Sequence, residues 1–98
     1  MGLSPDKIEK LKEYCIKNQI VYLGVFGSYA RGSNSKGSDI DLLAEFNGNV
    51  GLIRIARIKR ELSDLLGIPV DFLTKDALSP YLRAEILSTV QDLYEKAG

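Results

Sequence analysis

Two aspartates, Asp39 and Asp41, are the residues best suited to chemistry, and a single apolar residue, Ile40, separates them. Successive side chains of a β-strand point to opposite faces of the sheet, so both carboxylates are expected on one face and Ile40 on the other. Carboxylates ~4–5 Å apart repel each other by roughly 3–4 kcal/mol at an effective dielectric constant of ~20. Such a pair needs a proton, a basic partner or a divalent cation, and hard oxygen ligands favour Mg²⁺.

The segment before these aspartates has the composition of a phosphate-binding turn. An apolar run over residues 20–26 predicts a buried strand, which stops at Gly27-Ser28, where a short helix can begin. Glycine lets the backbone approach an anion closely, a helix start offers unpaired N–H groups, and the Ser28 hydroxyl adds a donor. After a Gly/Ser-rich loop, a second strand is predicted over residues 39–46.

These residues resemble the signature of the DNA polymerase β-like nucleotidyltransferase superfamily. The resemblance is carried by Gly27-Ser28-Tyr29-Ala30-Arg31-Gly32 and by Ser38-Asp39-Ile40-Asp41-Leu42. The sequence is most similar to the small stand-alone minimal nucleotidyltransferases, which are encoded beside HEPN-domain proteins and act as antitoxins. That family expects a third acid on a later strand, and Val70-Asp71-Phe72 supplies one. The resemblance covers nearly the whole chain.

The resemblance implies a magnesium-dependent nucleotidyltransferase with two Mg²⁺ ions and with ATP as substrate. It also implies a HEPN-domain toxin as partner, with AMP transferred to a tyrosine hydroxyl of that toxin. The residues expected at this site are the nucleotide-binding Gly27, Ser28, Arg31 and Lys36 and the catalytic, metal-binding Asp39, Asp41 and Asp71. Arg31 would contact phosphate or hold an aspartate in place. Lys36 is also consistent with an ordinary exposed loop lysine, which is the favoured alternative.

The flanking pattern predicts the elements that must position these residues. We expect an α/β (α+β) fold with a small mixed sheet flanked by helices, in the order helix, strand, short helix, strand, helix, strand, helix; the strand directions come from the resemblance. Ser4-Pro5 begins a helix that runs to about residue 18. A helix over residues 51–66 has an apolar stripe that includes Leu52. A strand over residues 68–73 follows, with Asp71 opposite the packed face.

The last predicted element is a helix over residues 80–96, begun by Ser79-Pro80. One apolar stripe of this helix comprises Leu82, Ile86, Val90 and Leu93. A second apolar patch on it comprises Tyr81, Leu87 and Tyr94. The second patch indicates a further buried surface, against a partner or a second copy of this chain.

The composition describes one globular domain over residues 1–98, with 45% hydrophobic and 27% charged residues. Thirteen basic and thirteen acidic residues cancel, which argues against a protein that grips long nucleic acid. No apolar run is long enough to span a membrane and no signal peptide is recognised, so we expect a cytoplasmic protein. The absence of histidine excludes the usual histidine-based zinc and serine-hydrolase sites and leaves the aspartates.

Two alternatives remain beside catalysis on a partner protein. The first is a non-catalytic antitoxin that neutralises its toxin by complex formation, through the last predicted helix and a stripe containing Arg54 and Arg57. The second is nucleotide transfer to an RNA end, which the neutral charge balance disfavours. An acidic phosphoacceptor pocket of the response-regulator type needs more alternating strands than this chain supplies.

Overall fold

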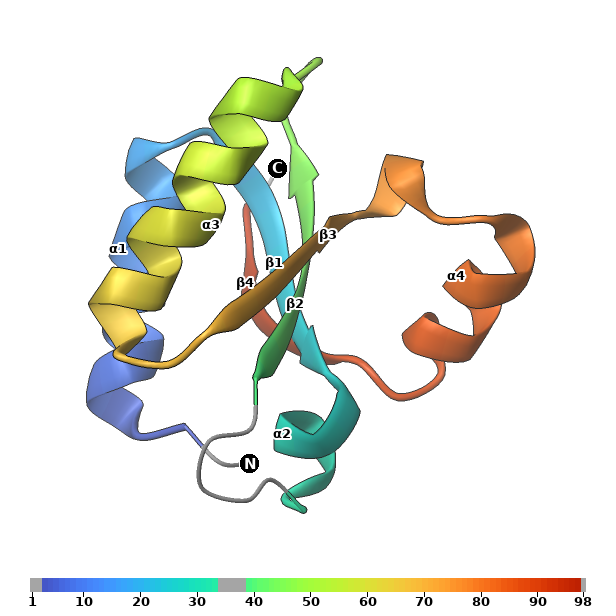
Figure 1. Ribbon diagram of the computed structural model, residues 1–98, viewed down its shortest axis with the longest axis horizontal. Helices are drawn as coiled ribbons and strands as arrows, with labels where there is room; N and C mark the ends of the chain where they lie inside the picture. The colour runs from blue at the N-terminus through green and yellow to red at the C-terminus, as the bar shows by residue number, and fades with distance from the viewer. Residues whose placement is uncertain (1–2, 34–38, 98) are drawn as a thin grey trace.

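The computed structural model describes residues 3–33 and 39–97, which form a four-stranded sheet with helices on both faces (Figure 1). Along the chain the elements are α1 (Pro5–Lys17), β1 (Ile20–Phe26), α2 (Gly27–Arg31), β2 (Ile40–Phe46), α3 (Leu52–Leu66), β3 (Val70–Thr74), the 3₁₀ turn η1 (Lys75–Ala77), α4 (Pro80–Leu87) and β4 (Gln91–Glu95). The predicted α/β class with a small mixed sheet is confirmed. None of the helices in the described residues is long and apolar enough to cross a membrane.

The sheet has the strand order β3-β2-β1-β4. β1 pairs antiparallel with β2 and with β4, whereas β2 and β3 run parallel. In this register Asp41 lies opposite Phe26 on one side and opposite Asp71 on the other. The end of β1 and the two aspartates therefore lie on three adjacent strands at the same end of the sheet.

The helices α1 and α3 cover one face of the sheet, and the main core lies beneath them (Figure 1). Ser4 caps α1 as expected, because its side chain accepts a hydrogen bond from the Lys7 N–H at 3.3 Å and Pro5 follows at the first helical position. Helices and strands both contribute to this core, which includes Leu11, Cys15, Leu23, Val25, Ile40, Leu42, Ile58, Leu62, Val70 and Phe72. Strand residues that alternate with these face the opposite side, and Asp41 and Asp71 are among them.

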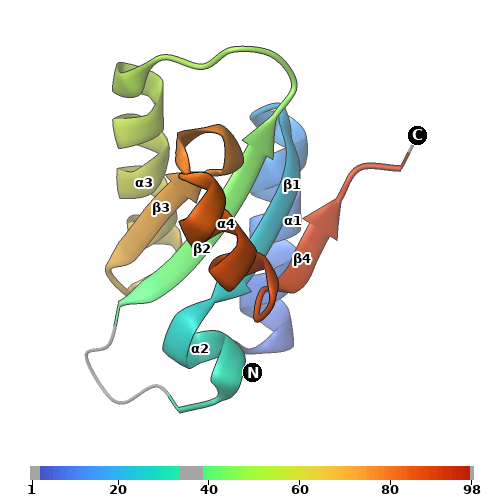
Figure 2. The same cartoon turned by 90° about the vertical axis from the view of Figure 1, so that its right-hand side faces the viewer.

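The other face of the sheet is partly covered by α4, which lies in front of the strands in Figure 2. A second, smaller core forms there from Tyr22, Leu43, Leu78 and Ile86, with Phe26, Leu73 and Val90 packed against it. Lys75 contacts this core through Tyr22. Its Nζ lies 3.9 Å from the centre of the Tyr22 ring and 3.2 Å from Oε2 of Glu45.

The final helix predicted over residues 80–96 is wrong beyond Leu87. The chain leaves α4 there and returns as β4, antiparallel to β1, so the element order ends in a strand. The predicted apolar stripe is divided between the two sides of the sheet, with Ile86 and Val90 in the second core and Leu93 in the main core. The helical spacing of these apolar residues was therefore a coincidence of two separate packing surfaces.

Contacts with β1 hold β4 in place. The Tyr22 hydroxyl donates a hydrogen bond to Oδ1 of Asp92 at 2.6 Å. A Cβ placed on Gly24 would lie 2.5 Å from that hydroxyl oxygen and 2.6 Å from Val90 Cγ2, so only glycine leaves room for both side chains. The second apolar patch predicted on the last helix does not form either, because Tyr94 belongs to β4 while Tyr81 and Leu87 remain exposed on α4.

Three smaller differences concern the ends of elements. Leu52, predicted in the core stripe of α3, is exposed at the first position of that helix. β3 begins at Val70, two residues later than predicted, after Pro69. β2 begins at Ile40, so Asp39 lies one residue ahead of the strand.

Candidate active site

Asp41 and Asp71 form the centre of the candidate site. They lie opposite each other across the parallel β2–β3 pair, and a hydrogen bond joins their side chains. Asp41 is half-buried and Asp71 is exposed. Strand alternation orients both carboxylates, because their neighbours along the two strands are buried in the main core: Ile40, Leu42, Val70 and Phe72.

The surroundings of Asp41 disfavour its negative charge. Burial is the largest cause that raises the pKa of the Asp41 carboxyl above its usual range, followed by the charge of Asp71 and the hydrogen bond with it. The Asp39 carboxylate raises this pKa further, whereas the Arg31 guanidinium lowers it. A divalent cation bound beside Asp41 would offset the repulsion from the neighbouring carboxylates.

The donor set of this site suits Mg²⁺ in its chemistry. It consists of carboxylate oxygens whose mutual repulsion a cation would relieve. Within residues 3–33 and 39–97, however, no three acidic or cysteine side chains are gathered closely enough to enclose an ion. Asp39, which is exposed ahead of β2, is near enough for its charge to act on Asp41. The assignment of Asp39, Asp41 and Asp71 as metal ligands stays a prediction.

The predicted phosphate cradle lies directly beside Asp41. Gly27 begins α2 with φ at +70°, a conformation that favours glycine. A Cβ at this position would collide with Oδ2 of Asp41, so the turn and the carboxylate fit together only around glycine. Ser28 follows in the first turn of the helix, and its carbonyl accepts a hydrogen bond from the Ser33 N–H at 2.9 Å. The short helix predicted at Gly27-Ser28 is confirmed.

The two predicted basic contacts have different outcomes. Arg31 is exposed at the end of α2, and its charge acts on Asp41, so it belongs to the same cluster as the acids. Lys36 lies outside the residues that the structure describes. A role of Lys36 in phosphate binding therefore stays a prediction.

A cleft of about 360 Å³ adjoins this cluster between α2 and α4. It is lined by Phe26, Gly27, Arg31, Leu73, Leu82, Glu85, Ile86, Ser88 and Thr89. The walls combine apolar side chains with a few polar groups, which is typical of small-molecule sites. The sequence alone did not indicate this cleft, because it depends on how α4 folds back over the sheet.

Sequence reasoning also missed Gln91, which acts on α2 from β4. Its Nε2 donates a hydrogen bond to the carbonyl of Ala30 at 3.0 Å, which connects the C-terminal half of α2 to the edge strand. No local signal could have identified this role, because Gln91 was assigned to a helix. The contact exists only once β4 pairs with β1.

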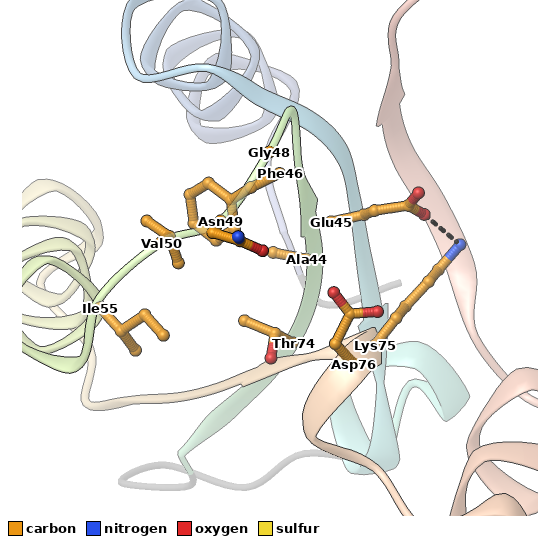
Figure 3. A pocket seen from close by; sticks show the side chains of 10 residues that line it. All are labelled: Ala44, Glu45, Phe46, Gly48, Asn49, Val50, Ile55, Thr74, Lys75 and Asp76. Atoms are coloured by element: carbon orange, nitrogen blue, oxygen red, sulfur yellow. Dashed lines mark ion pairs between the residues drawn. The ribbon is translucent and has the colours of Figure 1, made fainter.

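A second hollow, which we term the distal crevice, lies at the opposite end of β2 and β3 from the aspartates (Figure 3). It has a volume of about 300 Å³ and is lined by Ala44, Glu45, Phe46, Gly48, Asn49, Val50, Ile55, Thr74, Lys75 and Asp76. None of these residues belongs to the predicted catalytic set. The aspartate cluster, rather than this crevice, is the candidate active site.

Comparison with known sequences gives consistent results. Residues 8–93 match the model of the nucleotidyltransferase domain. MJ0435 of Methanocaldococcus jannaschii, named as a candidate protein adenylyltransferase, is 37% identical over 84 residues, which cover 86% of this chain and 90% of the relative. The protein adenylyltransferase MntA of Thermococcus cleftensis is 35% identical over 68 residues, 69% of each chain.

Solved structures extend the comparison. A candidate minimal nucleotidyltransferase is 36% identical, with a TM-score of 0.78 and 88% of each chain covered. A chain from the complex of a tri-AMPylated HEPN toxin of Shewanella oneidensis with its MNT antitoxin gives a TM-score of 0.74. That chain is 18% identical, with 92% of this chain and 71% of the other covered, so it shows a common fold alone.

Proposed function

This chain belongs to the nucleotidyltransferase domain family, and we propose that it transfers AMP from ATP to a tyrosine hydroxyl of a HEPN-domain partner protein. The match of residues 8–93 to the nucleotidyltransferase domain and the 37% identity to MJ0435 confirm the family inferred from residues 27–32 and 38–42. AMP transfer to protein is supported by MntA of Thermococcus cleftensis, which is named a protein adenylyltransferase. A HEPN partner is supported by the Shewanella oneidensis complex, in which the toxin is AMPylated.

The observation that carries this proposal is the placement of three groups on three adjacent strands. Gly27 follows β1, Asp41 lies on β2 and Asp71 lies on β3, all at one end of the sheet. A nucleotide whose phosphates rest on α2 has its reacting phosphorus near Asp41. The acceptor hydroxyl then approaches in line from the side of Asp71.

The chemical step needs one attack and one departure. The acceptor hydroxyl oxygen forms a bond to the α-phosphorus of ATP as the bond from that phosphorus to pyrophosphate breaks, and the hydroxyl proton passes to the Asp71 carboxylate. Backbone N–H groups at Gly27 and Ser28 and the Arg31 guanidinium bind the phosphates. Mg²⁺ held by Asp39, Asp41 and Asp71 would neutralise the charge that develops on the phosphates. The cleft between α2 and α4 takes the nucleoside, because it is continuous with Gly27 and Arg31.

The alternative is neutralisation by complex formation without chemistry. The surface expected for such a complex was the last predicted helix together with the stripe containing Arg54 and Arg57. This surface loses support at two points, because the last predicted helix ends at Leu87 and the Arg54 guanidinium already donates to the Asn18 carbonyl at 2.8 Å.

We place the reaction in the cytoplasm, where a buried free thiol such as Cys15 is usual.

The proposal is tested by incubating the protein with Mg²⁺ and ATP labelled at the α-phosphate, with and without a purified HEPN-domain protein from the same organism. We expect label on the partner with the wild type and with Glu13→Ala, which changes an exposed acid on α1. The double variant Asp39→Ala/Asp41→Ala should transfer no label. If the partner is neutralised but unlabelled by the wild type, complex formation replaces catalysis as the function.

A further inference from the structure

The distal crevice combines an apolar wall with polar groups on its rim. Val50, just before α3, and Ile55, in the first turn of that helix, face Thr74 across the hollow in Figure 3, and Phe46 lies at its upper side. Asn49 and Asp76 supply an amide and a carboxylate at the rim. An apolar pocket with a few convergent polar groups is suited to bind a side chain or a small molecule.

The Asp76 carboxylate gives this crevice an uncompensated negative charge. Among the described residues, no hydrogen bond or ion pair engages the Asp76 side chain, and the neighbouring Lys75 is paired with Glu45 at 3.2 Å. An apolar wall beside a free carboxylate matches a lysine or arginine side chain, whose aliphatic stem packs while its charged end meets the acid.

Two exposed apolar side chains extend this surface beyond the crevice. Leu52 is 84% exposed and Ile53 is 89% exposed, and both lie between the crevice residues Val50 and Ile55 in the chain. Large apolar side chains that remain in solvent beside a pocket indicate a macromolecular contact rather than a small ligand. The crevice and this pair together suit a protein partner that presents a basic residue next to apolar residues.

The edge strand β3 connects this surface to the active site. Asp71 lies near its start and Asp76 just after its end, and the five residue-to-residue steps between these positions span no more than about 17 Å. A protein interface of standard size covers roughly 800 Å² on each partner, which is enough to reach both points. Asp71 faces the side of the sheet opposite α3, but β3 is an edge strand, so a partner that covers this edge can contact Asp71 and the distal crevice at the same time.

We propose that the distal crevice and the Leu52–Ile53 pair form the docking site for the protein that carries the acceptor hydroxyl, and that the crevice receives a lysine or arginine of that protein. This inference rests on the proposed function for the identity of the partner. The docking site anchors the partner along β3, at a distance from the aspartates, and takes no part in the chemical step.

The test measures the dissociation constant between this chain and a purified HEPN-domain protein from the same organism, together with AMP transfer. The variants are Asp76→Asn and the double variant Leu52→Ser/Ile53→Ser, all at exposed positions where a change of side chain leaves the core intact. The matched controls are Glu13→Gln on α1 and Leu87→Ser on α4, which lie outside the crevice. Circular dichroism verifies that every variant is folded.

We expect both docking variants to weaken binding at least about tenfold, since they remove one partner of a desolvated charge pair and the apolar contact beside it. ATP binding should be unchanged, and the KM for the partner should rise while kcat at saturating partner stays the same. If wild type transfers no AMP yet the docking variants weaken binding, the docking site stands and the proposed reaction fails. Unchanged binding in both variants, or no binding by the wild type, overturns the docking site.

Discussion

Gly27 and Asp41 are fitted to each other at the junction of β1, α2 and β2. A Cβ built on Gly27 would lie 3.2 Å from Cγ of Asp41 and closer still to its Oδ2. The same glycine has φ at +70°, so both its backbone conformation and the space around it require the absence of a side chain. The turn that would bind phosphate and the carboxylate that would bind metal are thus positioned by one contact.

The replacement Gly27→Ala tests the contact between Gly27 and Asp41, and comparison with a control glycine separates the effect of this contact from that of backbone strain. A positive φ costs a non-glycine residue about 1–2 kcal/mol, so the variant should be destabilised by at least that amount. The new methyl group must also displace the Asp41 carboxylate, so AMP transfer should fall at least about a hundredfold. Urea denaturation and a transfer assay measure the two effects.

Gly67→Ala is the matched control for this variant. Gly67 has φ at +68° at the C-terminus of α3, and a Cβ there would meet no atom within 4 Å. The Gly67→Ala variant should lose as much stability from backbone strain as Gly27→Ala but should keep normal AMP transfer. Equal activity in the two variants would contradict the role given to the Gly27–Asp41 contact.

The raised pKa of Asp41 predicts that Asp41→Asn stabilises the metal-free protein at neutral pH. A carboxyl whose pKa is raised on folding binds its proton more tightly in the folded state, so stability falls as pH rises from the unfolded pKa through the folded pKa. The asparagine variant lacks this loss. Thermal melts should show a higher Tm for Asp41→Asn at pH 7 and a smaller difference in acid, whereas AMP transfer should be lost.

Magnesium should reverse that order of stability. A cation that binds only the folded wild type raises its Tm in proportion to the logarithm of the cation concentration. The Tm of Asp41→Asn should respond far less, because a ligand is missing. An equal response of the two proteins to Mg²⁺ would exclude Asp41 as a metal ligand.

Replacement of Arg31 should shift the acid side of the pH–rate profile. The Arg31 guanidinium lowers the pKa of Asp41, so Arg31→Ala should raise that pKa and move the loss of activity to higher pH. Arg31→Lys keeps the positive charge and should give a smaller shift. The profiles of kcat/KM for ATP between pH 4 and 8 measure this, and identical acid limbs in all three proteins would contradict it.

The replacement Tyr22→Phe tests the placement of β4. The Tyr22 hydroxyl donates to Asp92 at 2.6 Å, and loss of such a hydrogen bond should lower the free energy of unfolding by about 1–2 kcal/mol. Combined with Asp92→Ala, the two changes should not be additive, because they remove the same interaction. Strict additivity in urea denaturation would contradict the hydrogen bond between Tyr22 and Asp92.

Local patterns in the sequence were sufficient wherever one short segment carries its own signal. Ser4-Pro5 predicted the start of α1, the run over residues 20–26 predicted β1, and Gly27-Ser28 predicted the turn into α2. Asp71 was predicted opposite the packed face of its strand, and it is exposed while Val70 and Phe72 are buried. Caps, alternation and positive φ are properties of a few consecutive residues, so the sequence by itself determined them.

The tertiary structure alone decided where α4 ends, the strand that follows it and the contacts that complete the site. Residues 91–95 form a strand because β1 offers them a free edge, and Tyr22, which binds Asp92 there, lies 70 residues away in sequence. Gln91 reaches Ala30, and α4 closes the cleft beside Arg31, only as a result of that pairing. Strand pairing depends on partners that are distant in sequence, so helical spacing of apolar residues in this segment could not reveal it.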